Sequence, residues 1–181
     1  MPGDHGRVDE GLVPVIETGR LRLRAHRADD HAACVAIWSD PEVTRYIGGR
    51  PFTGEEVWKR LLQYLGLWSL LGYGYWAVEE KHSGRYIGDI GFADFWRDMQ
   101  PSLEGMLEFG WVLAPHAHGQ GYASEAVGAV VAWSEQHLAA RRAVCIIAPE
   151  NLPSIRVAEK AGFRLWLETT YHGSPTLVFS R

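Results

Sequence analysis

A short glycine-rich segment has the residue types of an anion-binding site. His118-Gly119-Gln120-Gly121-Tyr122 follows a strand-like segment that ends at Leu113, and a helical repeat begins at Ala123. The first backbone N–H groups of a helix lack internal partners, and the helix dipole adds about half a positive charge there. Glycines at 119 and 121 let this backbone approach phosphate oxygens closely. The segment is therefore a candidate pyrophosphate site without a lysine, and a glycine connection that binds no ligand is the alternative.

Other nucleotide motifs and a metal site fit this region poorly. A dinucleotide-binding fingerprint needs a third glycine where Ser124 stands, and a Walker loop needs Gly-Lys-Ser/Thr. His116 and His118 form a His-x-His pair, but the sequence offers no third ligand for a metal ion. Cys34 and Cys145 lie far apart and are expected in the core. We therefore expect no metal.

The segments around the glycine turn predict the element order β-α-α-β-β-β-α-β-α-β-β. Residues alternating with period two, or short apolar runs, predict strands over 18–24, 75–79, 85–91, 103–113, 143–148, 163–170 and 175–180. Caps and 3.6-residue periodicity predict helices from Asp29 and Asp30 to Trp38, from the Thr53-x-x-Glu56 capping box, from Ala123 to about Leu138, and from Asn151 to Ala161. The expected class is α/β (α+β type), with a central mixed, mostly antiparallel sheet of about seven strands and about four helices on its faces.

Length and composition indicate one soluble domain. A chain of 181 residues can bury one core, so we expect a single domain over 17–181 and a mobile tail over 1–16. No run approaches the ~18 apolar residues of a membrane helix, and the first residues do not resemble a signal peptide. A cytoplasmic protein without a membrane partner is expected. The net charge of -4 gives no basic field, so we also expect no nucleic-acid partner.

Six segments carry a pattern in a fixed order. They are Thr18-Gly19-Arg20-Leu21-Arg22-Leu23-Arg24, Gly88-Asp89-Ile90-Gly91, Leu107-Glu108-Phe109-Gly110-Trp111, Gly119-Gln120-Gly121-Tyr122-Ala123-Ser124-Glu125-Ala126, Asn151-Leu152-Pro153-Ser154 and Glu159-Lys160-Ala161-Gly162-Phe163. Over residues 18–180 the chain thus resembles the GNAT superfamily, in particular its ribosomal-protein N-terminal (RimJ/RimL-like) acetyltransferases. The resemblance implies an N-acetyltransferase with the GNAT fold. Its co-substrate would be acetyl-CoA, and its acceptor a protein N-terminal α-amino group or a small-molecule amine that attacks directly in a ternary complex.

The resemblance also implies which residues bind the cofactor. The family's glycine motif is Gln/Arg-x-x-Gly-x-Gly/Ala, and His116 stands in its first position. This departure is expected to alter affinity or specificity more than activity. The residues expected at the pyrophosphate are His116, His118, Gly119, Gln120, Gly121, Tyr122, Ala123 and Ser124. Those expected along the pantetheine arm are Trp111, Val112, Leu113, Ala114, Asn151 and Ser154.

Acetyl transfer needs a proton acceptor for the amine, a donor to the oxyanion and a proton for the thiolate. Glu108 would take the amine proton directly or through water; solvent exposure or pairing with an arginine is its alternative. The family's usual acid, a tyrosine, is replaced by Ala158. Ser154 matches a serine given that role in the ribosomal-protein branch, and a hydrogen bond within its helical turn is the alternative. A thiolate with a pKa near 8.5 can also leave without an acid. The oxyanion donor would be a backbone amide near Val112.

The acceptor site is the least specified part. Trp38, Tyr46 and Trp111 are expected to line it, with core packing as the alternative for each. A second hypothesis is a non-catalytic acyl-CoA-binding or regulatory module, because Ala158 and His116 depart from the family pattern. The other candidate residues are retained, which favours the enzyme. Both a monomer and a homodimer agree with the sequence.

Overall fold

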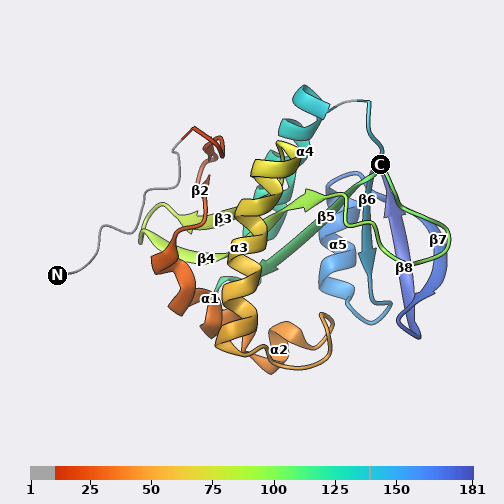
Figure 1. Cartoon of the computed structure of the whole chain (residues 1–181), viewed down its shortest axis with the longest axis horizontal. Helices are drawn as coiled ribbons and strands as arrows, with labels where there is room; N and C mark the ends of the chain where they lie inside the picture. Colours follow the sequence, from red (N-terminus) through yellow and green to blue (C-terminus); the bar gives the residue numbers. More distant parts are fainter. Residues whose placement is uncertain (1–10, 139) are drawn as a thin grey trace.

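An eight-stranded sheet organises the chain (Figure 1). The computed structural model describes residues 11–138 and 140–181. The strand order is β1-β2-β3-β4-β5-β6-β8-β7. The strands are β1 (Ile16–Glu17), β2 (Leu21–Arg24), β3 (Tyr75–Glu80), β4 (Arg85–Ala93), β5 (Leu107–Leu113), β6 (Ala143–Ile147), β7 (Arg164–Tyr171) and β8 (Ser174–Ser180). The helices are α1 (His31–Trp38), α2 (Pro41–Thr44), α3 (Gly54–Leu71), α4 (Tyr122–Leu138) and α5 (Leu152–Lys160), with the 3-10 turns η1 (Ala28–Asp30) and η2 (Pro115–Ala117).

The expected fold class is confirmed, and two short elements are added to it. The first is β1, which pairs with β2. The second is α2, which begins at a proline after Asp40, whose carboxylate accepts the Glu42 N–H at 2.8 Å. The third meander strand was predicted to begin at residue 103 but begins at Leu107, because Gly105 takes a left-handed φ of +80° in a turn before it.

Residues 11–16 belong to the folded domain, so the boundary expected for a mobile tail was placed too late. Val13 is buried, and the Pro14 carbonyl accepts the Trp76 indole N–H at 2.8 Å. Ile16 pairs with Leu23 of β2. The remainder of the expected tail, residues 1–10, lies outside the described residues.

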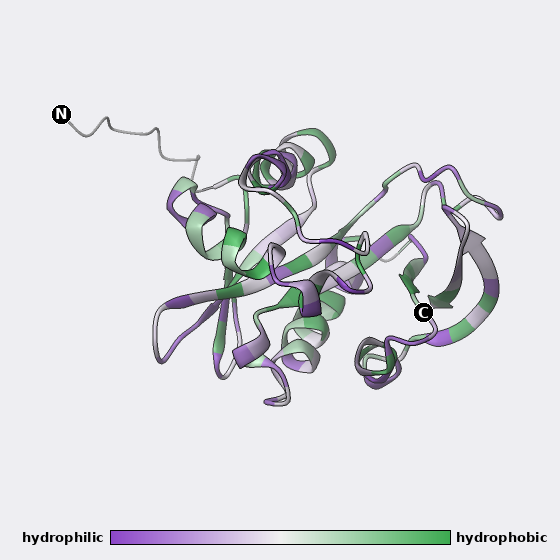
Figure 2. Ribbon diagram, turned by 90° about the horizontal axis from the view of Figure 1, so that it is seen from below, coloured by the Kyte–Doolittle hydropathy of each residue, from purple (hydrophilic) through white to green (hydrophobic). Residues whose placement is uncertain are grey.

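Helices cover both faces of the sheet. One cluster of buried side chains packs α4 and α5 on the face that carries Phe109 and Leu113 of β5. A second cluster packs α1 and α3 on the opposite face, which carries Tyr75 of β3 and, partly buried, Val112 of β5. Figure 2 shows hydrophobic colouring on parts of the central strands and on the helices beside them, and hydrophilic colouring on several of the outer turns. Successive residues of β5 therefore face different helices.

The sheet opens between β5 and β6. Strands β4 and β5 pair antiparallel from Gly88↔Leu113 to Ala93↔Glu108. Strands β5 and β6 pair in parallel, and within the described residues only at Leu107↔Ala143 and Glu108↔Val144. Beyond Glu108, no strand among the described residues pairs with the β5 edge that faces β6. Both strands continue into helices, α4 after β5 and α5 after β6, so the N-termini of these helices lie at the open end. We call this opening the β5–β6 gap.

Candidate active site

The glycine turn forms an exposed backbone loop before α4. Gly119 and Gly121 have left-handed φ values of +71° and +78°, which side chains with a Cβ rarely adopt. A Cβ on Gly119 would meet no atom within 4 Å, so this glycine is required by the backbone conformation and not by packing. His118, Gly119, Gln120 and Gly121 are all exposed. The first amides of α4 therefore lie beside open space.

Thr18 and Arg20, near the start of the domain, hold this turn in place through hydrogen bonds. Arg20 donates from Nη1 to the Gln120 carbonyl at 2.8 Å and from Nε to the Glu125 carboxylate at 2.7 Å. Thr18 donates from Oγ1 to the same carboxylate at 2.6 Å. Although burial opposes its ionisation, hydrogen bonds from Thr18 and Arg20 lower the pKa of Glu125. The contacts of Thr18 and Arg20 with Gln120 and Glu125 thus fix the turn.

Two polar side chains within the turn also shape it. His118 Nε2 lies 2.8 Å from the Leu113 carbonyl, and because a carbonyl only accepts, Nε2 carries the proton. Gln120 Nε2 donates to the His116 carbonyl at 2.8 Å. The His116 side chain is exposed. His118 and Gln120 therefore brace the loop, and its backbone amides are the groups suited to hold an anion.

The backbone groups of β5 point alternately toward β4 and toward the gap. The Leu107 amide donates to the Arg142 carbonyl, next to β6, at 2.9 Å. The Ala114 amide donates to the Ile87 carbonyl of β4 at 2.8 Å. Since successive residues of a strand direct these groups to opposite sides, odd-numbered residues of β5 face β6. Trp111 therefore directs its N–H into the gap.

This alternation corrects part of the predicted cofactor contacts. The Ala114 carbonyl also accepts a backbone bond, from Ala117 at 2.8 Å, so both backbone groups of Ala114 are used within the protein. The amide of Val112 faces β4 by the same alternation. Ala114 therefore has no free N–H with which to pair a pantetheine arm. The amides next to Val112 that face the gap are those of Trp111 and Leu113, and Trp111 is the nearer of the two to Glu108 along the strand. The Leu113 carbonyl is already occupied by His118.

Glu108 lies at the closed end of the gap in a buried ion pair. Its side chain is 7% exposed, and its two oxygens accept Nε and Nη2 of Arg97, each at 2.6 Å. Arg97 also donates to the Tyr171 hydroxyl at 3.1 Å. Burial raises the pKa of the Glu108 carboxyl above its ordinary value, although Arg97 opposes this. Glu108 is thus paired with an arginine, which was the alternative to a catalytic role. Its raised pKa nevertheless suits a proton acceptor. Arg97 lies in an irregular connection, where no sequence pattern pointed to it.

The N-terminus of α5 presents the other candidate residues. Asn151 caps this helix, as predicted, by accepting the Ser154 N–H on Oδ1 at 3.3 Å. The Ser154 hydroxyl makes no hydrogen bond to any residue that the structure describes, so the alternative of bonding within its own turn is not observed. Ala158 is fully buried. A partly exposed hydroxyl at position 154 is therefore the available donor on this helix.

A family model for the acetyltransferase (GNAT) domain matches residues 20–164. The chain belongs to the GNAT acetyltransferase family. The matched range contains the glycine turn, Glu108 and the cap of α5, which are the features that surround the β5–β6 gap. The expected family and the N-acetyltransferase class of enzyme are confirmed. GNAT acetyltransferases use acetyl-CoA, which agrees with the expected co-substrate.

Three relatives show the extent of the likeness. The uncharacterized N-acetyltransferase p20 of Bacillus licheniformis is 32% identical, across 84% of this chain and 83% of that protein. A structure described as a GNAT-family acetyltransferase from Bordetella pertussis has a TM-score of 0.81 and 29% identity, covering 93% of this chain and 99% of that chain. The RimL ribosomal-protein α-N-acetyltransferase in complex with coenzyme A has a TM-score of 0.75 and 18% identity, covering 93% and 97%. At that identity the RimL likeness concerns the fold alone.

Two of the three aromatic residues expected to line the acceptor site of this GNAT enzyme, Trp38 and Trp111, lie on opposite faces of the sheet. Trp38 is 2% exposed, lies on the α1/α3 face, and donates its indole N–H to Asp89 at 2.9 Å. Trp111 packs partly buried on the α4/α5 face. Tyr46 is half-buried after α2, with the Arg45 guanidinium 5.2 Å from its ring centre. The alternative of core packing therefore holds for Trp38.

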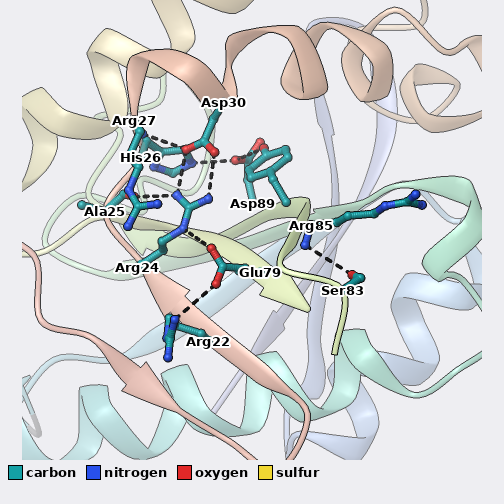
Figure 3. A network of polar contacts seen from close by, with 11 residues as sticks. Arg22, Arg24, Ala25, His26, Arg27, Asp30, Glu79, Ser83, Arg85 and Asp89 are labelled. Carbon is teal, nitrogen blue, oxygen red and sulfur yellow. Dashed lines mark hydrogen bonds and ion pairs between the residues drawn. The ribbon is translucent and has the colours of Figure 1, made fainter. Parts of the chain in front are cut away.

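Asp89, which belongs to the Gly88–Gly91 segment, is held in the core by buried hydrogen bonds (Figure 3). Besides Trp38, it accepts hydrogen bonds from the Tyr86 hydroxyl at 2.5 Å and from His26 Nε2 at 2.7 Å. Beside it in Figure 3, Asp30 pairs with Arg24 through two contacts of 2.8 Å. Asp30 was expected to cap α1, but its side chain makes no cap bond to that helix. These buried ionic contacts anchor the connection between β2 and α1.

Residues 11–138 and 140–181 contain neither a grouped set of metal ligands nor a membrane-spanning helix. In this part of the chain, no three His, Cys, Asp or Glu side chains are grouped to hold a metal ion. Cys34 and Cys145 are free and buried, as predicted. Across the same residues, no helix combines the length and the apolar character needed to cross a membrane.

Proposed function

We propose that this GNAT enzyme transfers the acetyl group of acetyl-CoA to a primary amine by direct attack in a ternary complex. The β5–β6 gap carries the proposal, because it leaves the Trp111 amide open on an unpaired strand edge at the N-termini of α4 and α5. Such an edge accepts an extended, amide-containing chain as an added strand. The pantetheine arm of acetyl-CoA has this chemistry.

The residues around the gap fit acetyl-CoA. The amides of the glycine turn and the first turn of α4 would hold its pyrophosphate, since the left-handed glycines leave that backbone accessible. Trp111 would pair with the arm from β5, and Asn151 with Ser154 would meet it from α5. When bound, acetyl-CoA supplies an acetyl group activated as a thioester.

The chain's own groups would perform three tasks. Glu108 would receive the amine proton, which its burial and raised pKa favour. The Trp111 N–H would stabilise the oxyanion, replacing the Val112 amide expected from the sequence. The Ser154 hydroxyl would hydrogen-bond to the departing sulfur and pass it a proton, and this partly exposed hydroxyl would recover a proton from solvent. Ala158 leaves no phenol on α5 for that last task.

The acceptor is proposed only as a primary amine, either a protein N-terminal α-amino group or a small-molecule amine. Glu108 and Val112 lie on the face of β5 that is covered by α1 and α3, so an amine that reaches Glu108 approaches from this side. The loop after α2, which contains Tyr46, is on the same side of the sheet as Val112 and contributes Ile47 to its cluster. We propose that this loop contacts the acceptor.

Release of free coenzyme A thiol tests the proposal. The purified chain is mixed with acetyl-CoA and a panel of amines and N-terminal peptides, and thiol release is compared with release without acceptor. Acceptor-dependent release is expected for at least one class, with the acetylated amine identified by mass spectrometry. Tight binding of acetyl-CoA, measured by calorimetry, without turnover on any acceptor would instead support the acyl-CoA-binding module.

A further inference from the structure

Tyr75 and two glycines form one row across the sheet. In the strand pairing, Tyr75 of β3 is opposite Gly91 of β4, and Gly91 is opposite Gly110 of β5. A residue directly opposite another on a neighbouring strand shares its face of the sheet. The row therefore has a tyrosine at one end and no side chain at the next two positions toward the gap.

The Tyr75 side chain fills the space that these glycines leave. A Cβ on Gly91 would lie 2.8 Å from Tyr75 Cγ, and a Cβ on Gly110 would overlap the Tyr75 hydroxyl oxygen, with the ring carbon Cζ at 3.5 Å. The ring thus extends from β3 across β4. Its hydroxyl ends against Gly110 of β5, between Glu108 and Val112 along the strand.

The hydroxyl itself is available. Tyr75 is 8% exposed, and its ring stacks on Tyr64 with centres 4.7 Å apart and planes at 12°. Its oxygen makes no hydrogen bond within residues 11–138 and 140–181. It is also not one of the unpartnered polar atoms that are sealed from solvent there, which are His26 Nδ1 and Arg60 Nε. Burial, followed by the nearby Glu108 charge, raises the pKa of Tyr75 above its ordinary value. The phenol therefore stays protonated and can donate.

We propose that the Tyr75 hydroxyl and the Trp111 N–H together bind the thioester carbonyl oxygen and the oxyanion that it becomes. The Trp111 N–H belongs to the peptide group directly after Gly110, and the Tyr75 oxygen contacts the face of Gly110. The Trp111 N–H points out from the edge of β5, and the Tyr75 hydroxyl approaches Gly110 from the face of the sheet. The inference rests on the proposed acetyl transfer, and it makes Tyr75 a catalytic residue that no linear motif reveals.

The two donors act on one oxygen during the transfer. The amine nitrogen bonds to the carbonyl carbon, and the π electron pair of the C=O bond moves onto the oxygen held by Tyr75 and Trp111. Glu108 takes the proton that the nitrogen loses. When the pair returns to re-form C=O, the C–S bond breaks, and the sulfur leaves with its electrons as thiolate. Tyr75 keeps its proton throughout, because its raised pKa makes it a hydrogen-bond donor and not an acid.

The test replaces Tyr75 with phenylalanine, which keeps the ring over Gly91 and removes only the hydroxyl. Tyr64→Phe is the matched control, because it removes a hydroxyl from the adjoining ring of the same stack, which reaches Arg60 and not β5. The first readout is the infrared carbonyl stretch of ¹³C-labelled acetyl-CoA bound without acceptor. The second is kcat with the best acceptor, alongside the thermal unfolding midpoint and the Kd of acetyl-CoA.

For Tyr75→Phe we expect the carbonyl stretch to move to higher frequency and kcat to fall by about 10²–10³-fold, as for loss of one oxyanion donor. Unfolding and the Kd should change little, and Tyr64→Phe should match the unaltered protein in both readouts. An unchanged stretch and an unchanged kcat in Tyr75→Phe would overturn the inference while leaving acetyl transfer intact. If the unaltered protein shows no transfer on any amine, the proposed function fails instead, and the carbonyl stretch still decides whether Tyr75 contacts the thioester.

Discussion

Glu108 shows how one side chain can satisfy two requirements of the site. The bidentate pairing with Arg97 holds the carboxylate in one orientation, while burial beneath the α1/α3 face raises its pKa. Each carboxylate oxygen has a second lone pair, so two bonds to Arg97 do not exhaust its capacity as an acceptor. The ion pair and the catalytic role, which the sequence posed as alternatives, are chemically compatible.

Glu108→Gln should slow acetyl transfer. The amide cannot accept the amine proton, so we expect kcat to fall by about 10²–10⁴-fold. The pH profile supplies a second test. A carboxylate accepts a proton only when it is ionised, so the activity of the unaltered enzyme should fall as the pH drops through the pKa of Glu108, which lies above the ordinary 4.5. Steady-state kinetics from pH 5 to 9 measure both effects, and Glu108→Gln should lose this acid limb.

The exposed Glu104, in the connection before β5, supplies the control for that experiment. Glu104→Gln removes the same charge from the same region without touching Arg97. It should retain the kcat and the pH profile of the unaltered enzyme. Equal losses in the two variants would attribute the effect to overall charge and remove Glu108 from the mechanism.

At the scale of elements, local sequence patterns predicted the helix caps and the glycine turn, which depend on interactions between residues close together in the sequence. The Thr53 capping box is present in both directions, with Glu56 N–H to Thr53 Oγ1 at 3.2 Å and Thr53 N–H to the Glu56 carboxylate at 2.8 Å. The glycine turn precedes α4 as predicted, and Asn151 caps α5. These features depend on residues a few positions apart, so one sequence suffices to find them.

Features that depend on distant residues were not predictable in the same way. The row of Tyr75, Gly91 and Gly110 exists only through the register of three strands, which no local pattern specifies. The burial of Trp38 depends on Asp89, 51 positions away. The direction of each β5 amide likewise depends on which residue begins the pairing with β6. Tertiary register, and not secondary structure, is what the sequence left undetermined.

A substitution in the glycine turn should weaken the binding of acetyl-CoA. Gly121→Ala places a Cβ at φ +78°, which costs about 1–2 kcal/mol in the left-handed region. The turn should relax to a different backbone conformation, and the Kd of acetyl-CoA, measured by calorimetry, should rise. Gly128→Ala is the control, because Gly128 lies in α4 and a Cβ there would meet no atom within 4 Å. That variant should raise the unfolding midpoint and leave the Kd unchanged, since alanine favours a helix over glycine. Equal Kd values for the two variants would contradict the assignment of the turn.

At the scale of the whole molecule, the sheet consists of two parts with few direct links. Strands β1 to β5 form one part and β6, β8 and β7 the other, and they join at Leu107↔Ala143 and Glu108↔Val144. The connection between β4 and β5 provides a second link, through Arg97 to the Tyr171 hydroxyl at 3.1 Å and from Thr169 Oγ1 to the Gln100 carbonyl at 2.7 Å. In Figure 1 this connection runs beside β7. The gap is therefore bounded at its closed end from both parts of the sheet.

A ligand in the gap would complete the pairing between these parts, and hydrogen exchange can detect it residue by residue. Without ligand, the Trp111 amide should exchange fast, because it faces the gap, while the amides of Val112 and Ala114 exchange slowly because they face β4. At a coenzyme A concentration of 100 Kd, only about one molecule in a hundred is free, so exchange at Trp111 should slow by about 100-fold. Exchange measured by NMR checks both statements. Fast exchange at Val112 that coenzyme A suppresses would reverse the assigned alternation, and the oxyanion donor would then return to the Val112 amide.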